Sequence, residues 1–174
     1  MNKKILRDFN SAWENFQAFE FAYRTLLPED REYLREQSAA YKRTVLAVQE
    51  IILPAVREHC PNCAYGTCCR LSTPELSIYI AGTVGGFCLT DYLLVRSDSK
   101  LPAPKFANSR RNLCPFWDNG CRLQPECRSL LCLQFFCEPL RRDLDMDLVD
   151  KRIAAVQAVV NNFSLSRLLG KSGQ

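Results

Sequence analysis

The N-terminal segment carries apolar side chains at steps of three and four residues, the spacing of one face of an α-helix. This series comprises Ile5, Phe9, Ala12, Phe16, Phe19, Tyr23 and Leu26. A second helix is expected from Pro28, because proline fits a first helical turn and the acids Glu29 and Asp30 complement the helix dipole there. Its apolar face continues through Leu34, Tyr41, Val45, Val48, Ile52 and Ala55. We expect Pro54 to bend or end this helix, and residues 1–58 to form an antiparallel helical hairpin.

The C-terminal segment repeats the helical pattern over residues 145–170. Its apolar series comprises Val149, Ile153, Val156, Val160 and Phe163. Gly170 stands where a C-terminal cap belongs. We expect this helix to dock on the N-terminal pair, with the apolar stripes serving as core rather than as a partner-binding face.

The middle of the chain, residues 60–137, is less periodic and richer in glycine, proline and cysteine. A short helix is expected from Ser72 to about Ala81, because Ser72 and Glu75 have the spacing of a capping box. The pattern therefore predicts a single, mainly α domain over residues 1–174. It would be a helical bundle, made of the N-terminal hairpin and the C-terminal helix, with an irregular cysteine-rich metal-binding segment inserted.

Composition adds one unusual number, ten cysteines against the single histidine His59. No export signal is predicted, since Ile5 and Leu6 are followed at once by Arg7 and Asp8. No apolar run reaches the roughly 18 residues of a membrane span. A cytoplasmic location is expected, and in a reducing compartment metal ligation is a commoner use of many thiols than disulfides, redox pairs or plain burial.

The net charge of +4 is counted with neutral thiols. Eight thiolates holding two zinc ions, or two four-iron clusters, would bring the total near zero. Between Ser99 and Cys137 there are six basic residues and two acids, which would offset thiolate charge. We interpret the basic balance as this compensation, and we do not expect nucleic-acid binding, because the basic pair at 110–111 lacks interleaved aromatics.

The cysteines form two groups. Cys60 and Cys63 have the two-residue gap of a metal-binding knuckle, and Cys68 and Cys69 follow closely. A thioredoxin-like redox pair is the alternative, but no strand-helix pattern surrounds the motif. The downstream group comprises Cys114, Cys121, Cys127, Cys132 and Cys137. The two groups must converge, since neither has a core of its own.

The order of these motifs resembles the YkgJ-type cysteine-cluster proteins, described as zinc- or iron-chelating domains. The matching residues are Cys60, Cys63, Cys68 and Cys69, then Thr73-Pro74-Glu75, Cys114-Pro115-Phe116, Asp118, Gly120-Cys121, Arg128, Cys132 and Cys137. The match covers roughly residues 60–137. Ser129 stands where the family usually has proline. Cys88 and Cys127 have no place in the pattern, and we interpret them as a buried apolar residue and an incidental or exchange-capable thiol.

The resemblance implies eight ligands, which fit two four-coordinate centres: Cys60, Cys63, Cys68, Cys69, Cys114, Cys121, Cys132 and Cys137. Thiolates suit both zinc and iron–sulfur clusters. We favour iron–sulfur, since the aromatic residues Phe116, Trp117, Phe135 and Phe136 would suit a shielded cluster, although an ordinary core around the site is the favoured interpretation of these residues. Arg128 is expected to donate to a thiolate or cluster sulfur, and His59 to have a capping or solvent role.

The predicted function is that of a metal-binding cysteine-cluster protein in metal handling, electron transfer or binding of a protein partner. The alternative is a metal-dependent enzyme, such as a protein methyltransferase or a redox enzyme, because a similar cluster occurs in flagellin lysine methylases. A nucleic-acid-binding zinc module is a third possibility. One histidine provides no Ser-His-Asp set, and no G-x-G-x-x-G loop is present, so hydrolase and dehydrogenase chemistry finds no support.

Overall fold

The computed structural model describes residues 3–59, 87–97, 99–106, 114–118, 121–134 and 136–164, with side chains from Trp13 onward. These ranges confirm the mainly α fold. They hold α1 (Lys3–Arg24), α2 (Pro28–His59), α4 (Leu89–Arg96), the 3-10 turn η3 (Pro125–Cys127), α5 (Leu130–Gln134), α6 (Glu138–Asp143) and α7 (Met146–Asn162). Bridge pairing within them involves Trp117 and Cys121, which pair with each other, and Phe87. The helix expected after Ser72 lies outside the described residues.

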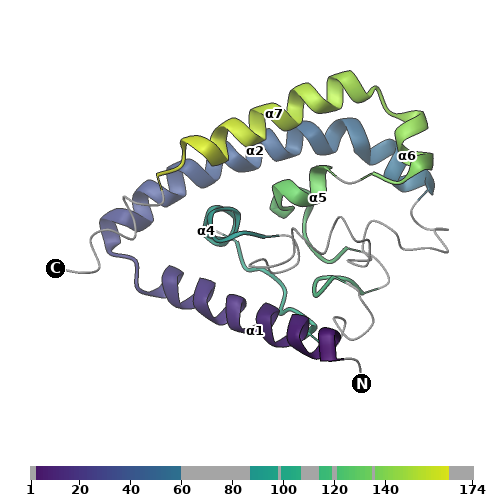
Figure 1. The fold of residues 1–174 in the computed structure, drawn as a ribbon. Coiled ribbons are helices and arrows are strands. Elements are labelled where there is room, and N and C mark those ends of the chain that lie inside the picture. Colours follow the sequence, from purple (N-terminus) through teal and green to yellow (C-terminus); the bar gives the residue numbers. More distant parts are fainter. Residues whose placement is uncertain are drawn as a thin grey trace.

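Helices α1 and α2 follow one another around a short turn and then diverge, with α4 and α5 between them (Figure 1). α1 packs on α4, where Phe19 and Tyr92 have ring centroids 5.4 Å apart. Glu20 adds a polar connection, since its carboxylate accepts a hydrogen bond from Arg96 Nε at 2.9 Å. The hairpin therefore encloses part of the middle segment instead of closing on itself.

Helix α2 is the central element and packs against α4, η3, α6 and α7. Its predicted apolar positions are all buried: Leu34, Tyr41, Val45, Val48, Ile52 and Ala55. The helix does not end at Pro54 but continues to His59. Both Pro54 and Glu50 are exposed, so the Glu50 carbonyl, which has no helical donor opposite the proline, remains open to water.

Helix α7 lies along α2 (Figure 1), and its inner face buries Val149, Ile153 and Val156. Asp145 caps its start by accepting a hydrogen bond from the Leu148 N–H at 3.1 Å. The helix ends at Asn162, eight residues before Gly170, and its C-cap residue is the buried Phe163. Expecting the cap at Gly170 was therefore wrong. Residues 165–174 lie outside the described ranges.

No helix in the described part of the chain combines the length and the apolar character needed to cross a bilayer.

Candidate metal centre

The predicted ligands divide between the described and the undescribed parts of the chain. Cys60, Cys63, Cys68 and Cys69 lie outside the described residues. The downstream ligands Cys114, Cys121, Cys132 and Cys137 are described, as are Cys88 and Cys127. All six described cysteines are free thiols.

Cys132 lies in α5 and has the most developed surroundings of these thiols. The buried Ser129 hydroxyl donates a hydrogen bond to Cys132 Sγ at 3.1 Å, and it accepts one from the Cys132 N–H at 3.3 Å. Cys132 is an exposed residue, and desolvation by the protein around its thiol still raises the pKa of that thiol. Ser129 lowers that pKa, the neighbouring Cys121 raises it, and the Arg128 guanidinium lowers it. Cys121, a second predicted ligand, therefore lies close enough to Cys132 to influence the charge of the Cys132 thiol.

Arg128 immediately precedes Ser129 and was expected to donate to sulfur. Its main-chain carbonyl accepts a hydrogen bond from the Tyr41 hydroxyl at 3.0 Å, which fixes this stretch of chain on α2. Its Nε atom is buried and has no hydrogen-bond partner in the described part of the molecule. Because a buried N–H without an acceptor is costly, this donor is suited to an acceptor such as a thiolate or a cluster sulfide.

Cys114 and Cys121 occupy the two ends of a tight turn. The Phe116 N–H donates to Cys114 Sγ at 3.4 Å, the kind of N–H to sulfur contact that orients a thiolate ligand. The Trp117–Cys121 bridge and the bond from the Arg122 N–H to the Phe116 carbonyl, at 2.9 Å, close the turn. Backbone contacts thus orient the Cys114 thiol and fix the main chain of Cys121.

The aromatic residues expected near the site have different positions. Phe116 is buried and meets Phe87 edge to face, with ring centroids 5.7 Å apart. Phe136 is partly buried against the core, and Trp117 is half-buried. Phe135 lies outside the described residues. Phe116 therefore belongs to the core, as the ordinary packing interpretation predicted.

Cys137 and the two cysteines outside the family pattern have separate places. Cys137 is half-buried and is the N-cap residue of α6. Cys127 is buried, and its thiol donates to Ser99 Oγ at 3.6 Å. Cys88 is exposed at the start of α4, so the expectation that it is a buried apolar residue was wrong. Among the described residues, no three cysteine sulfurs lie within 4.8 Å of one another.

A polar group that the sequence interpretation missed lies beside Cys132. We call it the Asp91 cluster, and it consists of the buried Tyr41, Asp91 and Ser129 with the exposed Cys88. Desolvation raises the pKa of Tyr41 well above its usual value, and Asp91, Cys132 and Cys88 push that pKa further in the same direction. Asp91 is 3% exposed, and its burial raises its pKa to about 6, although hydrogen bonds from Cys88 and the Leu130 N–H oppose this.

The sequence did contain a signal for this cluster. Asp91 is the one charged residue within the largely apolar run 87–95, and Tyr41 lies on the predicted buried face of α2. A charged residue among buried neighbours indicates a specific partner, because an isolated buried charge is unfavourable. What the pattern could not supply was the identity of that partner.

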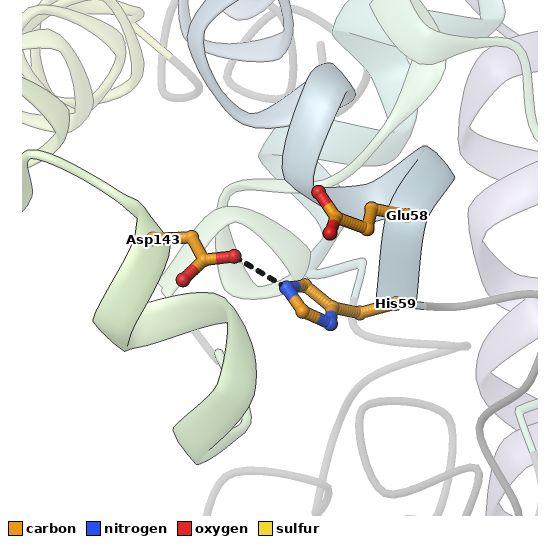
Figure 2. Close-up of side chains that lie close together, drawn as sticks. All are labelled: Glu58, His59 and Asp143. Carbon is orange, nitrogen blue, oxygen red and sulfur yellow. Dashed lines mark hydrogen bonds and ion pairs between the residues drawn. The ribbon is translucent and has the colours of Figure 1, made fainter.

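His59 makes a side-chain contact that the sequence interpretation did not expect. Its Nε2 lies 2.6 Å from Asp143 Oδ2, which joins the end of α2 to the end of α6 (Figure 2). With Glu58, these residues form the only group of three or more metal-ligating side chains found in the described ranges.

Comparison of the chain with protein-family models, curated proteins and solved structures found no match. The resemblance to YkgJ-type proteins therefore stays a prediction.

Proposed function

We propose that this protein binds metal through its cysteines, in an iron–sulfur or zinc centre that joins the segment 60–69 to the segment 114–137. The observation that carries the proposal is the buried Arg128 Nε, which has no acceptor in the described part of the chain and belongs to a guanidinium that lowers the pKa of Cys132. An anionic metal–sulfur centre would supply that acceptor and would balance the charge.

The donor set supports the same proposal. Cys114 and Cys132 already accept hydrogen bonds, from a backbone N–H and a hydroxyl, as ligating sulfurs commonly do. Cys121 and Cys132 lie near each other although they come from different local structures. When bound, zinc would organise the fold around four thiolates, whereas an iron–sulfur cluster would add the capacity to carry an electron.

In this proposal the protein works in the reducing cytoplasm, where it handles metal, transfers electrons or presents a surface to a protein partner. The buried Asp91 favours a second candidate, a metal-dependent enzyme, because a carboxyl with a pKa of about 6 beside a tyrosine and thiols is a pattern typical of active sites. In such an enzyme Asp91 would accept or donate a proton in methyl-transfer or redox chemistry.

The test is anaerobic purification of the full chain, followed by metal analysis and a visible absorption spectrum. Iron, acid-labile sulfide and a brown colour would identify iron–sulfur, and about two zinc ions in a colourless protein would identify zinc. Cys132→Ser is expected to lower the bound metal by at least one centre. Cys127→Ala is the matched control, since Cys127 lies outside the predicted ligand set. This variant should keep the full metal content of the wild type. A metal-free, fully folded wild-type chain would overturn the proposal.

A further inference from the structure

Three side chains with metal-binding atoms meet where two helices end. Glu58 and His59 are the last residues of α2, and Asp143 is the last residue of α6. One ligand atom from each, a carboxylate oxygen or an imidazole nitrogen, lies within 4.8 Å of the other two. Figure 2 shows both carboxylates turned toward the same edge of the His59 ring.

The fold, and not local sequence, creates this meeting. His59 and Asp143 are 84 residues apart in the chain, and the packing of α6 on α2 brings them to 2.6 Å. The exposed α6 acid nearer its start, Glu138, is paired instead with Arg142, 3.3 Å away.

The electrostatics of the group favour a cation. Two carboxylates accompany one imidazole, and no lysine or arginine salt bridge to Glu58 or Asp143 is found among the described residues. The group also lies at the C-terminal end of the 32-residue α2, where the main-chain carbonyls give a negative potential. His59 is half-buried, while Glu58 and Asp143 are exposed and can adjust.

We propose that Glu58, His59 and Asp143 bind a divalent first-row transition-metal ion through one nitrogen and two oxygens. Such ions hold these ligands at about 2.0–2.2 Å, so two ligands of one ion lie at most about 4.4 Å apart. A small movement of the exposed carboxylates satisfies that limit. Water completes the coordination, because the group is open to solvent.

This nitrogen–oxygen site is distinct from the sulfur centre in its chemistry. It contains no cysteine, and carboxylate oxygen suits a harder ion such as Mn²⁺, which thiolates do not select. The site therefore does not depend on the proposed function, and Mn²⁺ is a probe that separates the two.

The experiment uses the fact that His59 is the single histidine of the chain, so its ring-proton NMR signals need no assignment. Paramagnetic Mn²⁺ added to the full-length protein should broaden those signals at sub-stoichiometric amounts. Asp143→Asn and Glu58→Gln should each raise the Mn²⁺ concentration needed for this broadening by about tenfold or more. Glu138→Gln, which removes an exposed carboxylate from the same short helix, should leave it unchanged.

Equal broadening in wild type, Asp143→Asn and Glu138→Gln would overturn the proposal, because it would show non-specific contact with Mn²⁺. Absence of broadening would also overturn it, and would leave the His59–Asp143 contact as an ion pair alone. Cysteine-bound metal, measured on the same samples, should be unaffected by Asp143→Asn, so failure of this site and failure of the sulfur centre give different results.

Discussion

Helix α2 has two contrasting neighbours, α7 and the cysteine-bearing segment 114–137. Toward α7 the molecule buries aliphatic side chains, among them Val149, Ile153 and Val156. The cysteine-bearing segment instead carries buried polar groups, including Ser129 and Arg128 Nε, which has no hydrogen-bond partner among the described residues. Its helices, η3 and α5, have only three and five residues. Apolar burial is sufficient to hold the first region, whereas the second contains groups that need a specific partner.

A bound metal should stabilise the cysteine-bearing segment more than the contact between α2 and α7. Short helices are marginal by themselves, so segment 114–137 depends on what surrounds it. Gln49 on α2 and Asp91 on α4 also bury side-chain atoms without a hydrogen-bond partner in the described part of the chain. We therefore expect the two regions to respond differently to metal loss, to core mutation and to pH.

Removal of the metal should have the largest effect and should act on one region only. We expect a chelator, or Cys132→Ser, to abolish protection from hydrogen exchange over residues 114–137, because structural metal sites supply about 10 kcal/mol or more of apparent folding free energy. Amides of α7 should stay protected. Loss of protection in both regions at once would show that the two are a single cooperative unit.

A cavity in the apolar region should give the opposite response. Ile153→Ala removes a buried side chain from α7 and should lower the free energy of unfolding by about 2–4 kcal/mol. Urea denaturation measures this loss, and the exposed Lys151→Ala is a control from the same helix. Bound metal should remain at the wild-type level in both variants. A fall in metal content with Ile153→Ala would contradict the separation of the regions.

The buried Asp91 predicts a dependence of stability on pH. Its pKa in the folded protein is about 6, above the ordinary 3.8, so burial favours the protonated form. The stability present below about pH 4 should decline as the pH rises through 6, by at most about 3 kcal/mol. Asp91→Asn should remove this decline and be more stable than wild type at pH 7. Unfolding curves at several pH values measure the decline in stability. Parallel pH profiles for the wild type and Asp91→Asn would show that Asp91 does not cause it.

The smallest expected effect is that of Arg128→Met, which retains a long apolar side chain but no donor. Loss of a group that hydrogen-bonds a ligating sulfur typically weakens metal binding about 10–100-fold. Competition with a chelator measures that affinity, and Arg142→Met on the exposed face of α6 is the matched control. An unchanged affinity for metal in Arg128→Met would show that Arg128 does not interact with the metal centre.

Much of the helical framework could be predicted from the sequence, because periodic apolar residues mark a buried face directly. The spacing of α2 predicted Leu34, Tyr41 and Val45 as core, and all are buried. The expectation for the end of α7 was wrong, since a glycine in sequence does not show that the helix reaches it. The convergence of the two cysteine groups stays a prediction, because residues 60–69 lie outside the described ranges.

The sequence alone determined the mainly helical class, the inward face of α2 and the concentration of thiols in the middle of the chain, since these follow from local spacing and composition. Tertiary structure alone decided that Asp91 lies beside Tyr41, and that His59 meets Asp143. The physical reason is that a helix period specifies which residues share a face. The partner opposite that face is selected by packing between distant segments, and no local pattern encodes it.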